Sequence, residues 1–269
     1  MRKTILITGA SDGIGKRTAH HLCQLGHHVL IHGRDPAKIA QVEMELQDYS
    51  KAKIESYIAD LSDLNSVVQF AEAVAQQHPK LDVLINNAGI FATPNTLTKD
   101  GLDVRFAVNA IAPYVLTQRL LPILGAEGRV VNLSSAAQAP VNLEALASVP
   151  RLSDSAAYAQ SKLALTMWSC ELGQQHPQGP MIVAVNPKSF LGSKMVKDAY
   201  GIAGGNLDLG ADVLVRASLD ASFAQANGQY FDNDAECFAQ PHLDALDHAK
   251  NSALIAAIEQ VVAQKLHAA

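Results

Sequence analysis

Short apolar runs rich in β-branched residues alternate with stretches of helical periodicity along most of the chain. The first run, at 3–8, leads into a helical pattern whose apolar positions are Ala19, Leu22 and Leu25. Further strand-like runs lie at 28–32, 53–59, 81–85, 129–133, 181–186 and 229–231. This alternation predicts an α/β fold, because each helix can cover the sheet formed by the strands before and after it.

Helical patterns fill the segments between these runs. Pro36 suits the first turn of a helix that carries Ile39 and Val42, and another helix follows Tyr158. Further helices are expected at 64–77, 102–124, 207–224 and 243–262. No linker, repeat or low-complexity stretch interrupts the pattern, so we predict a single domain over residues 1–269.

Composition fits a globular protein and narrows the class of partner. The 269 residues are 48% hydrophobic and 17% charged, with a net charge of −5 and scattered Lys and Arg. A nucleic-acid surface is therefore not expected. No signal-peptide pattern is seen, and no apolar run approaches the roughly 20 residues that span a bilayer. The sequence predicts a cytoplasmic protein without a membrane span.

Cysteine and histidine patterns give no metal site. The three cysteines are far apart and odd in number, which fits a reducing compartment. The histidine pairs at 20–21 and 27–28 lack the helical spacing to further ligands that metal sites show. We therefore predict no bound metal.

A glycine-rich turn follows the first strand and opens the first helix. It comprises Gly9, Ser11, Asp12, Gly13, Ile14 and Gly15 together with Ala10. Backbone N–H groups at such a helix N-terminus can bind a pyrophosphate, and glycines let the backbone approach it closely. The turn predicts a dinucleotide site, with an ordinary tight turn as the alternative.

The end of the second strand bears on which dinucleotide binds. Gly33 and Arg34 leave room and a guanidinium for a 2′-phosphate, whereas an acidic residue there would accept from a ribose 2′-hydroxyl. NADP(H) is therefore favoured over NAD(H). The alternatives are that Arg34 is a solvated loop charge and that Asp35 turns inward.

Two further strand ends carry candidate cofactor contacts. Asp60, followed by Leu61, is placed to contact the adenine amino group, although it could instead only cap the helix at 64–77. At the fourth strand end, Asn87, Ala88 and Gly89 follow Asn86, and small residues there allow close approach of a cofactor.

A tyrosine and a lysine four positions apart are the strongest candidates for chemistry. Tyr158 and Lys162 would share one face of a helix, so the ammonium can favour the ionised phenol. A phenol whose pKa is lowered from about 10 toward neutrality can donate a proton to a carbonyl oxygen or accept one from an alcohol. The same spacing recurs at Tyr49 and Lys53, so the pair needs its context.

These motifs together resemble one family. Thr8-Gly9-x-x-x-Gly13-x-Gly15, Asn86-Asn87-Ala88-Gly89 and Tyr158-x-x-x-Lys162, in this order, are similar to the short-chain dehydrogenase/reductase family. The resemblance implies a doubly wound Rossmann fold, a seven-stranded parallel sheet in a three-layer αβα arrangement, with cofactor and substrate at the carboxyl ends of the strands. The long segment 136–154 and the residues around Ser161 are more similar to the retinol-dehydrogenase-like branch.

The same resemblance assigns roles within the site. Ser135 would hydrogen-bond the substrate oxygen, with Ser134 as the other candidate, and Lys162 would bind the nicotinamide ribose. Asn109 takes the place of a helix-bending asparagine that holds a water linked to the lysine; the alternative is a buried amide satisfied by backbone. Pro187 and Phe190 would contact the cofactor.

Two positions depart from the family pattern. Lys188 replaces the glycine that normally follows Pro187, and Ser193 sits one residue later than the usual hydroxyl contact to the nicotinamide amide. We hypothesise that Lys188 crowds this turn and lowers turnover; a solvent-facing lysine is the alternative. The segment 188–206 reads as a lid and 136–154 as a substrate loop, both with apolar residues.

The sequence thus predicts an NADP(H)-dependent oxidoreductase that interconverts a carbonyl and an alcohol on a small, fairly apolar substrate, with Tyr158 as general acid/base. Two alternatives stay open: a catalytically weak dinucleotide-binding sensor or interaction protein, and a nucleotide-sugar epimerase or dehydratase. Apolar helix faces near Leu116 and Trp168 suit either a homo-oligomer interface or internal packing.

Overall fold

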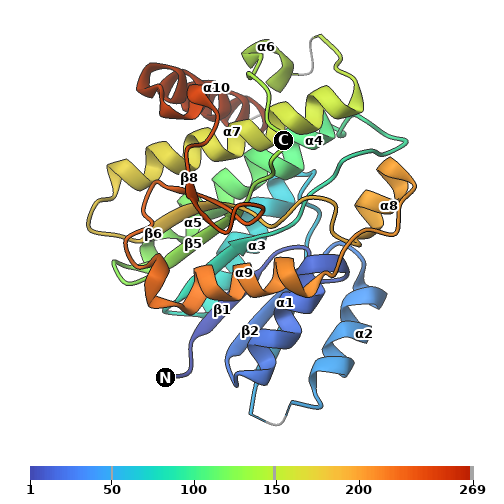
Figure 1. Ribbon diagram of the computed structural model, residues 1–269, viewed down its shortest axis with the longest axis vertical. Coiled ribbons are helices and arrows are strands. Elements are labelled where there is room, and N and C mark those ends of the chain that lie inside the picture. The colour runs from blue at the N-terminus through green and yellow to red at the C-terminus, as the bar shows by residue number, and fades with distance from the viewer. Residues whose placement is uncertain (50, 148–149, 267–269) are drawn as a thin grey trace.

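An eight-stranded sheet with the order β3-β2-β1-β4-β5-β6-β7-β8 runs through the middle of the computed structural model (Figure 1). The structure describes residues 1–49, 51–147 and 150–266. The strands are β1 (Thr4–Ile7), β2 (His28–Gly33), β3 (Lys53–Ile58), β4 (Val83–Asn86), β5 (Arg129–Leu133), β6 (Met181–Asn186), β7 (Tyr230–Asp232) and β8 (Cys237–Ala239). The order reverses between β1 and β4, which opens a crevice at the carboxyl ends of these strands.

The parallel part of the sheet has seven strands as expected, but an eighth strand extends it. Strand β8 pairs antiparallel with β7, through Phe238 opposite Phe231. Because β8 is only three residues long and largely exposed, its sequence shows no alternation of hydrophobic and polar residues from which a strand could be predicted. Its pairing depends on the turn at Glu236, whose φ is 58°, and on edge-to-face contacts of Phe238 with Phe231 and Phe223.

Two helical layers cover the two faces of the sheet. Side chains of alternating direction produce two cores: Leu6, Leu30 and Leu84 face one layer, while their neighbours Ile5 and Ile7 face the other. One layer consists of α1 (Gly13–Gln24), α2 (Pro36–Leu46) and α9 (Asp208–Leu219). The other consists of α3 (Leu64–Gln77), α5 (Ala112–Leu124) and α7 (Asp154–Gln175), with α10 (His248–Leu266) against α7 (Figure 1). The three-layer α/β fold is therefore confirmed.

Three helices predicted as continuous are divided by local features. The segment predicted at 102–124 is α4 (Val104–Phe106), the π-helix η1 (Ala107–Ile111) and α5. The segment 207–224 ends as α9 and continues as the 3₁₀ helix η2 (Ala221–Phe223), because Asp220 caps that new turn. The segment 243–262 is the 3₁₀ helix η3 (Leu243–Leu246), a break at Asp247 and then α10.

The segments predicted as substrate loop and lid each contain a short helix. The loop at 136–154, of which residues 148–149 lie outside the described residues, holds α6 (Leu143–Leu146). The lid at 188–206 holds α8 (Lys194–Tyr200), which stands at one side of the molecule in Figure 1.

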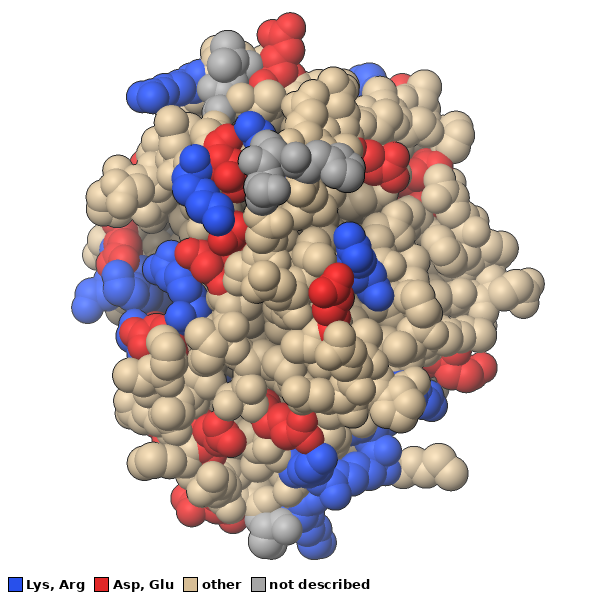
Figure 2. Space-filling view, turned by 180° about the vertical axis from the view of Figure 1, so that it is seen from behind, with Lys and Arg blue, Asp and Glu red and all other residues tan. Residues whose placement is uncertain are grey.

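Surface charge is mixed on the face opposite to that view. Figure 2 shows lysines and arginines intermixed with aspartates and glutamates over this face, with large uncharged areas between them. Over the residues that the structure describes, every helix is too short or too polar to cross a bilayer.

Candidate active site

A cavity of about 450 Å³ opens at the carboxyl ends of the parallel strands. The segments that follow β1 to β6 contribute its walls, together with α7 and the lid segment. The cavity is lined by the predicted residues Gly9, Ser11, Asp12, Gly13, Ile14, Gly15, Arg34, Asp60, Leu61, Asn87, Ala88, Gly89, Ser135, Tyr158, Lys162, Pro187 and Phe190. Asn109 lies behind this surface, fully buried.

The glycine-rich turn forms a cradle that only glycine can make. Gly9 and Gly13 have φ values of 68° and 57°. A Cβ on Gly9 would lie 2.8 Å from the Cα of Ala88, and one on Gly15 would lie 2.3 Å from the carbonyl oxygen of Gly9. The turn also ends in the N-terminus of α1, which Asp12 caps by accepting from the Gly13 N–H at 2.7 Å. This geometry suits a pyrophosphate group.

Hydrogen bonds from Asn87 hold the glycine-rich turn in place. Its Nδ2 donates to the carbonyl oxygens of Thr8 and Gly9 at 2.8 and 3.1 Å. The backbone N–H groups of Asn87 and Ala88 both donate to the Thr8 hydroxyl at 3.1 Å. The Asn87 side chain is therefore occupied in joining the end of β4 to the turn after β1.

His32 is a supporting residue that sequence reasoning missed. It is the next-to-last residue of strand β2, where its Nδ1 accepts from the Gly9 N–H at 3.4 Å and its Nε2 donates to the Ala59 carbonyl at 3.1 Å. Its ring stacks on Phe70 with centroids 4.6 Å apart. Burial lowers the pKa of His32 to about 4, so the ring is neutral at pH 7. Only its position directly before Gly33 in the sequence could have suggested this role.

Arg34 and Asp35 take different directions at the end of β2. Arg34 is exposed and lines the cavity, and in the described ranges no ion pair is recorded for its guanidinium. The Asp35 carboxylate instead accepts from the N–H groups of Ala37 and Lys38 at 3.0 and 3.3 Å, which caps α2. The carboxylate that could have met a ribose hydroxyl is therefore bound to the helix.

Asp60 is not a helix cap. Its Oδ1 accepts from the N–H and the hydroxyl of Ser62 at 2.9 and 2.8 Å, whereas Asp63 caps α3 through the Asn65 N–H. Asp60 thus forms a small turn at the cavity wall. Leu61 beside it is buried.

Tyr158 and Lys162 lie one turn apart on α7, as their spacing predicts. The Lys162 ammonium is 5.8 Å from the centre of the Tyr158 ring and donates to the carbonyl of Leu133 at 2.6 Å. Burial lowers the pKa of Lys162 to about 8. Tyr158 is partly exposed to the cavity, and its ring lies 5.0 Å from that of Phe91.

Asn109 fixes the wall of the site through three hydrogen bonds. Its Oδ1 accepts from the Ile90 N–H at 2.8 Å, and its Nδ2 donates to the Ile90 carbonyl and the Ser161 hydroxyl, each at 2.9 Å. Ser161 in turn donates to the Tyr158 carbonyl at 2.7 Å. The side chain therefore links the π-helix to the turn of α7 that carries the tyrosine.

The two serines after β5 are distinguished by their contacts. Ser134 is buried, and its hydroxyl is 2.6 Å from that of Thr166 on α7. Ser135 is partly exposed at the cavity, where its hydroxyl accepts from the Ala137 N–H at 3.1 Å. Only Ser135 can turn its hydroxyl toward a bound substrate without breaking a buried hydrogen bond.

The turn after β6 is strained at the lysine that replaces glycine. Lys188 has a φ of 115° and Phe190 a φ of 52°, both in the region that favours glycine. The Lys188 ammonium donates to the carbonyl of Asn233 at 3.3 Å and lies 3.9 Å from Glu236. Ser193 caps α8 through the Val196 N–H at 3.3 Å.

Apolar side chains surround the open side of the cavity. Ile90 and Phe91 line it from the loop after β4, and Met195 and Val196 from α8. Phe91 was missed by sequence reasoning, although it lies only two residues after the asparagine motif. Among the described residues of the loop at 136–154, only Ala136 and Ala137 line the cavity, whereas Leu146 is fully buried in the core.

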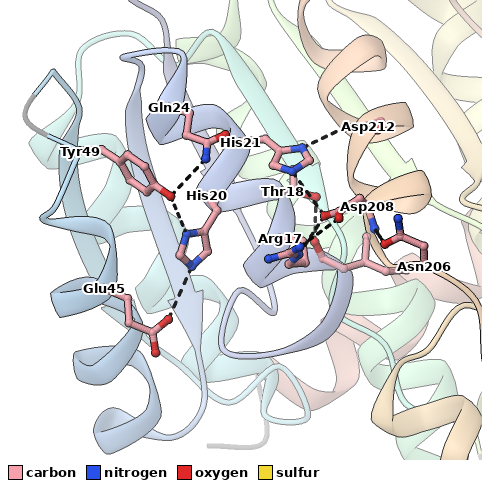
Figure 3. A network of polar contacts seen from close by, with 11 residues as sticks. Arg17, Thr18, His20, His21, Gln24, Glu45, Tyr49, Asn206, Asp208 and Asp212 are labelled. Carbon is pink, nitrogen blue, oxygen red and sulfur yellow. Dashed lines mark hydrogen bonds and ion pairs between the residues drawn. The ribbon is translucent and has the colours of Figure 1, made fainter. Parts of the chain in front are cut away.

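The two ends of the lid segment are hydrogen-bonded to each other, and the residues that follow it contact α1. Gly192 donates to the Gly205 carbonyl at 2.7 Å, and Gly205 to that of Phe190 at 2.8 Å. Figure 3 shows a second contact, in which the Arg17 guanidinium donates two hydrogen bonds to the Asp208 carboxylate, at 2.8 and 2.9 Å. Helix α1 is therefore joined directly to the first residue of α9, two positions after the lid segment.

Comparison with known proteins places this site in context. Residues 3–200 match the short chain dehydrogenase family. Human polyprenol dehydrogenase is 38% identical over 179 residues, which are 63% of this chain and 54% of that protein. Mouse retinol dehydrogenase 14 is 36% identical over 188 residues, 64% of this chain and 56% of that protein. The chain thus spans little more than half the length of these relatives.

A solved structure agrees in fold. A short chain dehydrogenase from Burkholderia cenocepacia in complex with NADP is 28% identical, with a TM-score of 0.69 over 86% of this chain and 95% of that one. The predicted Rossmann fold and the resemblance to the retinol-dehydrogenase-like branch are confirmed.

Proposed function

The chain belongs to the short chain dehydrogenase family, and from that premise we propose that it is an NADP(H)-dependent oxidoreductase that interconverts a carbonyl group and an alcohol. One observation carries the proposal. Tyr158 and the buried Lys162, 5.8 Å from its ring, share a single cavity with Ser135 and the glycine-rich cradle. Binding a dinucleotide alone does not require this set of side chains.

The residues around the cavity fit the cofactor. Gly9, Gly13 and Gly15 would hold the pyrophosphate, Arg34 the 2′-phosphate and Lys162 the nicotinamide ribose. When bound, the nicotinamide supplies or accepts the hydride. Capping of α2 by Asp35 supports NADP(H), because it leaves the guanidinium as the charged group facing the ribose site.

The chain's own residues manage the oxygen and its proton. The Ser135 hydroxyl would donate to the carbonyl oxygen and orient it. Tyr158 would then donate its phenolic proton to that oxygen in reduction, or accept the proton in alcohol oxidation. A protonated Lys162 favours the phenolate, since burial leaves its charge poorly screened by solvent. Asn109 would support the proton relay by positioning the Ile90 backbone and the Ser161 hydroxyl, which donates to the Tyr158 carbonyl.

The substrate we propose is apolar. Ile90, Phe91, Met195 and Val196 present hydrocarbon surface next to Tyr158. The two relatives carry the names of enzymes for polyprenol and retinol, which are isoprenoid alcohols. An isoprenoid aldehyde or alcohol is therefore the first substrate class to test.

The test is cofactor oxidation by purified protein. We would follow NADPH beside NADH with isoprenoid aldehydes, simple apolar ketones and a polar aldehyde of matched reactivity. Turnover with NADPH and apolar carbonyls, absent in Tyr158→Phe, would support the proposal. Tight NADPH binding without turnover on any carbonyl would favour a dinucleotide sensor instead.

A further inference from the structure

Two histidines and a glutamate converge at the β3 edge of the sheet, near the amino end of β2. His28 begins β2, Glu55 lies in β3 and His78 follows the last turn of α3. The His28 Nε2 is 3.0 Å from Glu55 Oε1, and the His78 Nε2 is 3.2 Å from Glu55 Oε2. Among the described residues, this is the group of three or more histidine, cysteine or acidic side chains whose ligand atoms all lie within 4.8 Å of one another.

These separations suit ligands around one ion. Zinc binds imidazole nitrogen and carboxylate oxygen at about 2.0–2.2 Å, which puts neighbouring ligand atoms of a tetrahedral site about 3.3 Å apart. The two measured nitrogen–oxygen separations are close to that value. A set of two histidines and one carboxylate leaves a further position for water or another ligand.

The surroundings of His28 suit an imidazole ligand. The His28 side chain is only 10% exposed. Its Nδ1 is 3.4 Å from the Thr4 hydroxyl, which can accept a hydrogen bond from the Nδ1–H and orient the ring. A metal-bound histidine commonly has such an outer partner.

The surroundings of His78 also favour a cation. Its side chain is 9% exposed and lies at the C-terminal end of α3, where the helix dipole is negative. The Tyr57 hydroxyl is 2.9 Å from the His78 Nε2 and donates to Gln77 at 2.7 Å. Tyr57 is thus close enough to act as a further ligand or to orient a bound water.

One cation already competes for the carboxylate. The Lys53 ammonium lies 2.5 Å from Glu55 Oε1, but the lysine side chain is 58% exposed and can move into solvent. An incoming divalent ion would displace it. Replacing Lys53 by a neutral residue should therefore tighten metal binding rather than weaken it.

We propose that His28, Glu55 and His78 bind one divalent first-row transition-metal ion, with Zn²⁺ as the reference ion. The sequence predicted no metal, because 27 positions separate His28 from Glu55 and no helical repeat relates them. The ion would join the edge strand β3 to β2 and α3. It lies at the amino end of β2, whereas Gly33 at the other end of that strand faces the cofactor cavity, so its role is structural.

The test is Zn²⁺ binding by the full chain purified without a histidine tag. A chromophoric chelator competes for the ion, and the affinity and stoichiometry are read from its absorbance. We expect one Zn²⁺ per chain in the wild type and a raised melting temperature on binding. Glu55→Gln and His78→Gln should each lose more than the roughly 10–100-fold in affinity that removal of an outer-shell partner costs.

Two further variants make the test independent of folding defects. Lys53→Gln should bind Zn²⁺ up to about fivefold more tightly, since a partly exposed ion pair is worth up to about 1 kcal/mol. His27→Gln removes the neighbouring histidine outside the cluster and should bind as the wild type does. Equal affinity in the wild type and Glu55→Gln, or loss of binding in His27→Gln, would overturn the proposal. Co²⁺ absorption would report the coordination number independently.

Discussion

The ammonium of Lys162 lies 5.8 Å from the centre of the Tyr158 ring, one helical turn further along α7. The lysine is buried while the tyrosine reaches the cavity, so a charge on the ammonium acts on the phenol with little screening by water. The lysine is held in this position by the Leu133 carbonyl at the end of β5. Helix and sheet together therefore set the pair's geometry.

Tyr158→Phe removes the proposed proton donor and leaves the ring in place. We expect turnover to fall by about 10²–10⁴-fold, the usual contribution of a general acid or base. NADPH affinity, followed by fluorescence titration, should change little because the cradle and Lys162 remain. Activity near that of the wild type would contradict the assignment.

Arg34→Ala tests the preference for the 2′-phosphate. Hydrogen bonds to a charged group are worth about 1.5–3 kcal/mol, so NADPH should bind about 10–100-fold more weakly. NADH affinity should stay nearly constant, because NADH lacks the phosphate. Equal losses for both cofactors would mean that the arginine supports the loop rather than the phosphate.

Asp35→Ala is the matched control at the adjacent position. The carboxylate caps α2, so its loss should lower the free energy of unfolding by about 0.5–2 kcal/mol. The ratio of NADPH to NADH affinity should be that of the wild type. A shift of this ratio toward either cofactor would show that Asp35 reaches the ribose.

Lys188→Gly should relieve the strained turn after β6. A non-glycine residue at a φ of 115° costs about 1–3 kcal/mol, partly offset by the roughly 0.5–1 kcal/mol of extra chain entropy that glycine loses on folding. We expect a gain of about 1 kcal/mol in urea unfolding, and higher turnover if the lysine crowds the nicotinamide site. Lys188→Ala keeps the Cβ and should not be stabilised. Unchanged stability, cofactor affinity and turnover in the glycine variant would mark the lysine as solvent-facing.

His32 should make the fold sensitive to acid. Its folded-state pKa of about 4 is below the ordinary value of 6.5, so between these pH values the unfolded chain binds a proton that the folded chain does not. Stability is therefore lost as the pH falls from 6.5 to 4, by about 3 kcal/mol from this residue. His32→Gln should be less stable at pH 7 but show a shallower loss over this range. If the free energy of unfolding, measured with urea, fell by the same amount between pH 6.5 and 4 in both proteins, His32 would be excluded as the source of the acid sensitivity.

The motifs and the order of elements followed from the sequence, because they depend on local interactions. Strand and helix periods specify the parallel sheet, and the glycines mark the cradle because Gly9 and Gly13 have positive φ and a Cβ on Gly15 would clash with the Gly9 carbonyl. The four-residue spacing of Tyr158 and Lys162 sets their common helix face. Each of these features is encoded within a few consecutive residues.

Contacts between distant segments needed the tertiary structure. Thr166 on α7 engages Ser134 and leaves Ser135 at the cavity, while β8 exists only through its pairing with β7. His28, Glu55 and His78 meet because β2, β3 and α3 pack at one edge of the sheet. A linear sequence fixes the direction of a side chain relative to its own strand or helix, but only packing decides which other side chain it meets.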